Sequence, residues 1–112
     1  MGSNKRLAAT ALVTAVSAVT LAGCGTEGKI MDYDDVSVWP SADTRGRQPI
    51  GTLTTLSKVT VKCVERGQRD ANGMGYADAY KIEFEGGTGY IDTHTSILTD
   101  DGELSPSNVD EC

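Results

Sequence analysis

The chain has 112 residues, of which 16 are acidic and 10 basic, so its formal net charge is −6. This length allows one small domain with a limited core, and the acidic balance argues against nucleic-acid binding, which needs clustered Lys and Arg to replace phosphate counterions. With 13 Gly, 3 Pro and 23% charged residues, the composition is typical of a loop-rich β domain and excludes collagen or a coiled coil.

The N-terminal segment combines a basic start with an apolar run. Lys5 and Arg6 precede Leu7–Leu21, in which every residue is apolar or small. A helix needs about 20 residues to cross the ~30 Å hydrocarbon core, so this 15-residue run is too short to span a membrane. Its length and basic flank instead indicate a secretory signal.

The apolar run ends in Leu21-Ala22-Gly23-Cys24. This tetrapeptide resembles the lipobox of bacterial lipoprotein precursors. The resemblance implies that residues 1–23 are a cleaved signal peptide and that the Cys24 thiol carries a diacylglyceryl group. Such an anchor holds a protein stably on a membrane, so we expect a location on the outer side of the cell membrane. The alternative is an ordinary signal peptide with a cysteine nearby by chance.

Cleavage would make the remaining chain more acidic. The signal takes two bases and no acid, so 8 bases and 16 acids remain and the net charge becomes −8. Anionic headgroups repel such a chain, so lipid alone would hold it at the membrane. Residues 24–35 are expected to be the lipidated Cys and a flexible tether, because 25–35 (GTEGKIMDYDD) is polar and without periodicity. Its acids lack the following Gly of a calcium loop, so no metal site is expected.

From Val36 onward the pattern predicts short strands separated by turns. Two short strands, at 36–39 and 50–53, flank a polar stretch at 41–49, and Lys58–Val64 then shows the cleanest alternation of the chain. A period of two places Val59, Val61 and Cys63 on one face, so we expect Cys63 beside the core.

The second half of the domain reads as a loop followed by a hairpin. Residues 65–75 predict a long mobile loop with a turn at Asn72-Gly73. The segments 76–84 and 89–92 predict a hairpin with Tyr80, Ile82 and Phe84 toward the core. Residues 93–95 suit one short helical turn, and Ile97-Leu98 a closing strand.

The remaining two cysteines suggest a crosslink. In an exported chain Cys63 and Cys112 are most simply a disulfide, which would tie back an acidic C-terminal tail at 99–112. The alternatives are a free thiol at Cys63 or pairing of Cys112 between chains. Without the anchor, this acidic tail would be disordered.

Five or six short strands without helical periodicity indicate a small all-β barrel over residues 36–98. Four segments of this region carry a resemblance to a known family: Ile50-Gly51-Thr52-Leu53, Lys58-Val59-Thr60-Val61, Tyr80-Lys81-Ile82-Glu83-Phe84 and Thr88-Gly89-Tyr90-Ile91. They resemble the bacterial SH3-like domains of exported and cell-wall proteins. The resemblance implies an SH3-like barrel. The sequence departs from the family pattern at residues 38–41, so no ligand residue is carried over.

Catalytic and metal-binding chemistry are not expected. His94 is the single histidine and has no nucleophile nearby in the sequence, so we predict no enzyme, no cofactor and no metal. A binding surface is better supported, because Trp39 and Tyr76 offer rigid contact area and Arg45 and Arg47 lie in the intervening loop. Trp39 is equally compatible with a place in the core.

The sequence therefore predicts a lipid-anchored, non-catalytic adaptor whose partner is cell-wall peptide or another exported protein. Two alternatives stay open. One is a lipoprotein of phage or prophage origin that blocks superinfection at the membrane, and the other is a purely structural spacer of the cell envelope.

Overall fold

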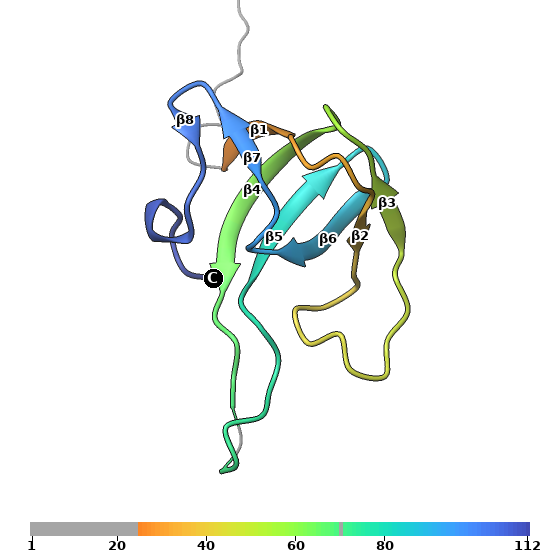
Figure 1. Cartoon of the computed structure of the whole chain (residues 1–112), viewed down its shortest axis with the longest axis vertical. Helices are drawn as coiled ribbons and strands as arrows, with labels where there is room; N and C mark the ends of the chain where they lie inside the picture. Colours follow the sequence, from red (N-terminus) through yellow and green to blue (C-terminus); the bar gives the residue numbers. More distant parts are fainter. Residues whose placement is uncertain (1–24, 70) are drawn as a thin grey trace, which may run out of the picture.

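A computed structural model describes residues 25–69 and 71–112, and the predicted all-β class is confirmed in this part of the chain (Figure 1). The predicted signal peptide and Cys24 lie outside the described residues. The strands are β1 (Thr26–Ile30), β2 (Val36–Val38), β3 (Gly51–Leu53), β4 (Lys58–Glu65), β5 (Ala79–Phe84), β6 (Gly87–Asp92), β7 (Ile97–Thr99) and β8 (Gly102–Glu103), followed by the 3-10 helix η3 (Pro106–Asn108).

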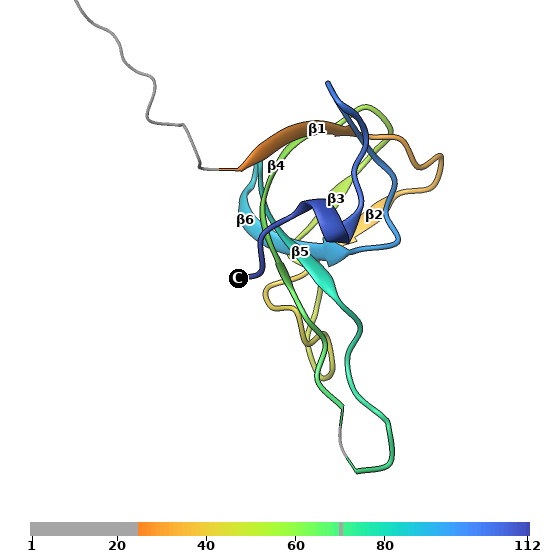
Figure 2. The ribbon, with the colours of Figure 1, turned by 90° about the vertical axis from the view of Figure 1, so that its left-hand side faces the viewer.

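The strands form an open six-stranded antiparallel sheet and a separate two-stranded one. The larger sheet has the order β6-β5-β4-β1-β7-β8, and β2 pairs with β3. The two sheets meet where the backbone of Trp39 exchanges hydrogen bonds with Tyr90 of β6, at 2.8 and 2.9 Å. This junction sets the β2–β3 hairpin against the larger sheet, as Figure 2 also shows.

A single apolar cluster lies between the strands, and most of its members are β-branched or aromatic residues that suit a pleated surface. Tyr80 and Ile82 are fully buried and Phe84 packs against the cluster, as the alternation of β5 predicted. The other buried members are Ile30, Val36, Val38, Leu53, Val59, Val61, Val64, Ile91 and Ile97.

The expected position of Cys63 beside the core is wrong. The pairing of β4 with β5 shifts between Val61 and Cys63, so Lys62 is an extra residue in a β-bulge. The bulge reverses the alternation, and Val64 takes the fully buried position instead. Cys63 is only half-buried.

The predicted tether is also wrong for residues 26–30. Residues Thr26–Ile30 form β1, which pairs with β4 on one side and with β7 on the other. Ile30 is fully buried. The domain therefore begins at Thr26 and not at Val36.

The C-terminal tail is part of the fold. Thr99 is the last residue of β7, and β7 pairs with β8. Leu104 and Val109 pack against the core. The last residues lie beside β4, where Val64 N–H donates to the Asp110 carbonyl at 2.8 Å. The domain thus extends to Cys112 and does not end at Leu98.

The predicted disulfide is confirmed. Cys63 and Cys112 are bonded, with 4.9 Å between their Cα atoms and a sequence separation of 49. Cys63 is half-buried and Cys112 is exposed, so the bridge is not shielded by the core.

Residues 66–69 and 71–78 project from the sheet as a narrow arm, seen at the bottom of Figures 1 and 2. Arg69 and Gly75 face each other across it, and Gly73 adopts φ +78° at its turn. Residues 93–95 form a hydrogen-bonded turn and not the helical turn that was expected. In the described part of the chain no helix is long and apolar enough to cross a bilayer.

Candidate functional site

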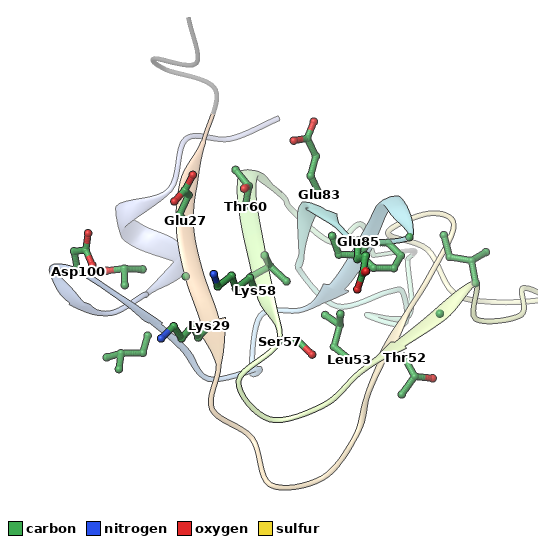
Figure 3. Close-up of a pocket in the computed structure, with 18 residues that line it drawn as sticks. Glu27, Lys29, Thr52, Leu53, Ser57, Lys58, Thr60, Glu83, Glu85 and Asp100 are labelled. Atoms are coloured by element: carbon green, nitrogen blue, oxygen red, sulfur yellow. The ribbon is translucent and has the colours of Figure 1, made fainter. Parts of the chain in front are cut away.

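An open groove of about 1220 Å³ runs between the β1–β4 side of the larger sheet and strand β3 (Figure 3). Its walls come from β1, β3, β4, β7 and the turn between β5 and β6. The sequence did not indicate this groove, because its walls come from segments far apart in the chain.

Two lysines mark the β1–β4 wall of the groove. Lys29 and Lys58 are direct partners in the antiparallel pairing of β1 with β4, and Figure 3 shows both side chains on this wall. Directly opposite residues have Cβ atoms about 5 Å apart, and like charges in such a pair repel. Among the described residues neither ammonium group forms an ion pair with a carboxylate.

Apolar side chains are exposed along the same groove. Ile50 is 52% exposed and Leu98 is 45% exposed. Phe84 also lines the groove and packs against the core and against Gly51 of β3. Gly51 allows this packing, because a Cβ at position 51 would sit only 3.1 Å from the Phe84 ring.

Carboxylates complete the lining. Glu83 lies 3.4 Å from the ammonium group of Lys62; Glu27, Glu85 and Asp100 also line the groove. The groove thus combines a pair of cations, apolar area and separate acids. This mixture suits a segment of peptide, which can present a carboxylate, an apolar side chain and a cationic group at spaced positions.

The four residues predicted to form a binding surface lie in two places: Arg45, Arg47 and Tyr76 are near Asp43, and Trp39 is at the junction with β6. Asp43 holds Arg45 by two side-chain contacts, at 2.9 and 2.7 Å, and accepts from its backbone N–H at 3.1 Å. These hydrogen bonds, together with the positive charges of Arg45 and Arg47, lower the pKa of Asp43 to about 2. Arg45 is therefore engaged within its own loop.

Tyr76 belongs to the same neighbourhood. Burial raises its pKa, and the carboxylates of Glu65 and Asp43 add to that effect. The structure thus brings Arg45, Arg47 and Tyr76 around Asp43. Trp39 is half-buried, and its backbone forms the junction with Tyr90.

His94 lies in a turn, as the sequence indicated. Asp92 accepts from the His94 backbone N–H at 2.7 Å, and the same oxygen lies 2.8 Å from Nδ1. The Asp32 carboxylate accepts from the backbone N–H of Ser96 at 2.8 Å, so it joins two loops. Within residues 25–69 and 71–112, no three His, Cys, Asp or Glu side chains are grouped to hold a metal ion.

Comparisons with protein-family models, with curated proteins and with solved structures gave no match for this chain.

Proposed function

We propose that this protein is an extracytoplasmic lipoprotein, anchored through Cys24, whose β domain binds an extended peptide without catalysing a reaction. Two features support export. The segment ending in Leu21-Ala22-Gly23-Cys24 resembles a lipobox, and the Cys63–Cys112 disulfide is of the kind that persists in oxidising compartments outside the cytosol.

The fold that we propose is a variant of the SH3-like barrel. The β2–β3 hairpin lies at one edge of the larger sheet and is joined to β6 by the Trp39–Tyr90 pairing. Val36 and Val38 of the hairpin share a core with β4, β5 and β6. This arrangement folds the strands around one apolar centre, as in small barrels.

The observation that carries the binding proposal is the unpaired cross-strand cation pair in the groove. Two ammonium groups held opposite each other repel, and an anionic ligand between them would relieve that repulsion. A carboxylate bound there would accept charge-assisted hydrogen bonds, while Ile50, Phe84 and Leu98 cover an adjacent apolar side chain. Cell-wall peptide and a segment of another exported protein both present this chemistry.

The test compares two variants that each remove two positive charges. The full-length protein is applied to purified, insoluble peptidoglycan, and the retained fraction is measured over a range of concentrations. We expect Lys29→Ala with Lys58→Ala to weaken retention by at least about tenfold, since hydrogen bonds to charged groups contribute about 1.5–3 kcal/mol each. Arg45→Ala with Arg47→Ala should leave retention within about twofold, because neither arginine lines the groove.

Two other results would contradict the proposed binding site. Retention that depends on the arginine pair and not on the lysine pair would place binding on the Arg45 loop. Absence of retention of the unmodified protein would discard wall peptide as the ligand.

A further inference from the structure

The first strand starts immediately after the proposed lipid attachment point. Only Gly25 separates Cys24 from Thr26, the first residue of β1. One extended residue spans about 3.5 Å, whereas a flexible tether of 11 residues would span roughly 18 Å. A lipid on Cys24 would therefore leave the domain almost no freedom to move away from the bilayer.

β1 is held in the sheet on both sides, so it cannot detach to lengthen the link between Cys24 and the domain. It pairs with β4 from Thr26 to Lys29 and with β7 at Lys29 and Ile30. Ile30 is fully buried, and its backbone N–H donates to the Ser57 carbonyl at 2.9 Å. Releasing β1 would separate β4 from β7 and open the core.

We infer that the edge of the domain around Gly25 rests directly on lipid headgroups; this inference depends on the lipid anchor proposed above. We name this edge the anchor surface, and its members surround a small depression beside the start of β1. They are Gly25, Thr26, Val61, Lys62, Asn108, Val109 and Asp110.

The chemistry of the anchor surface suits headgroups and not hydrocarbon. Gly25, Thr26, Asn108 and Asp110 are exposed and polar or small. Lys62, whose ammonium group lies 3.4 Å from Glu83, adds a positive charge beside them. The exposed apolar residues Met31, Tyr33 and Leu56 lie beyond the other end of β1. Leu56 is joined to that end, because its N–H donates to the Ile30 carbonyl at 2.6 Å.

The length of β1 then determines how far the groove lies from the membrane surface. Figure 2 shows the start of β1 and the loop that follows it on opposite sides of the molecule. At about 3.3 Å per residue, Lys29 lies only about 10 Å along β1 from Thr26. The groove would therefore face ligands that lie close to the membrane.

The test uses the full-length lipidated protein in vesicles of phosphatidylethanolamine and phosphatidylglycerol that contain a phospholipid with a photoactivatable headgroup. Peptides crosslinked on illumination are identified by mass spectrometry. We expect labelling of peptides containing Gly25–Thr26, Lys62 or Asn108–Asp110 to exceed that of the 31–35 loop and the 71–75 arm tip several-fold. A matched variant with a Gly/Ser spacer of about 10 residues between Cys24 and Gly25, spanning roughly 17 Å, should lose this enrichment.

Equal labelling patterns in the two proteins would overturn the inference, as would labelling concentrated on the 31–35 loop. The mass of the mature N-terminal peptide distinguishes the two proposals. If acyl chains are present but labelling is not focused, only this inference fails. If Cys24 carries no acyl chain, the lipid anchor itself fails and the inference with it.

Discussion

At the scale of single residues, Asp78 holds the base of the projecting arm. Its carboxylate accepts from the Gly67 backbone N–H at 2.7 Å and from the Arg66 guanidinium at 3.0 Å. The Gly67 hydrogen bond and then the Arg66 contact lower the pKa of Asp78 below its ordinary 3.8. Arg66 also donates to Glu111 at 3.2 Å, which links the arm to the C-terminal segment.

This contact predicts the acid sensitivity of the arm. Because the folded-state pKa of Asp78 is lowered, its contribution to stability is complete above the ordinary pKa of 3.8 and is lost as the pH falls through the lower folded value. The amide proton of Gly67, followed by NMR, should therefore titrate with a midpoint below 3.8.

The Asp78→Asn variant should abolish the Gly67 titration. Asp100→Asn, in the distant turn between β7 and β8, should leave it unchanged. A midpoint at or above 3.8 in the unmodified protein would contradict the assignment of this hydrogen bond.

The residues of β4 show which side-chain positions the alternating pattern predicts and which it does not. The pattern of Lys58–Val64 correctly placed Val59 and Val61 in the core. It could not place Cys63, because the bulge at Lys62 depends on how β4 pairs with β5 and leaves no mark in β4 alone.

At the scale of elements, the contact between β6 and the β2–β3 hairpin decides whether the two sheets stay together. Gly89 is buried in β6, and a Cβ at this position would overlap the Val38 side chain and lie 3.1 Å from the Trp39 carbonyl oxygen. Glycine is required here for this close approach.

We therefore expect Gly89→Ala to lower the free energy of unfolding by about 1–3 kcal/mol, the usual effect of overpacking a core. Urea denaturation followed by Trp39 fluorescence measures this change. Thr88→Ala, at the neighbouring exposed position, should change stability by less than about 0.5 kcal/mol. Equal stability of Gly89→Ala and the unmodified protein would show that the sheets do not pack as described.

Elements with clear alternation or turn residues could be predicted from the sequence, and the others could not. The segments of β2 and of β4 to β7 contain Val, Ile, Tyr or Phe, and β3 directly follows Ile50; each was expected close to its observed place. β1 was missed because Thr26–Ile30 contains one buried apolar residue among polar ones. Its strand conformation comes from pairing with β4 and β7, which is tertiary information.

The missed strand also explains the missed groove. Lys29 was assigned to a tether, so its position opposite Lys58 could not be predicted from the sequence. Of the residues predicted as a binding surface, Arg45, Arg47 and Tyr76 lie near Asp43, and Trp39 lies at the junction with β6; their part in binding stays a prediction.

At the scale of the whole molecule, the disulfide closes a loop that contains β5 to β8. Cys112 N–H donates to the Val64 carbonyl at 3.0 Å, so the bridge also completes the pairing of the C-terminal segment with β4. In the chain-entropy model a loop of this size stabilises the folded state by about 4 kcal/mol.

Replacing Cys63→Ser together with Cys112→Ser should therefore lower the midpoint of urea denaturation substantially, and reduction of the unmodified protein should have a similar effect. The reduced, unmodified protein keeps both cysteine side chains, so its comparison with the double variant separates the effect of losing the disulfide from the effect of changing the side chains. Two reactive thiols in the untreated folded protein, beyond Cys24, would show that the bridge does not form.

The proposed function and the proposed membrane contact both require a lipid on Cys24, two residues before the first strand begins. The direct test is mass analysis of the N-terminal peptide of the mature protein isolated from bacterial membranes. The predicted result is a chain that starts at Cys24 and carries a diacylglyceryl group on sulfur. An unmodified Cys24, or a chain that retains residues 1–23, would contradict it.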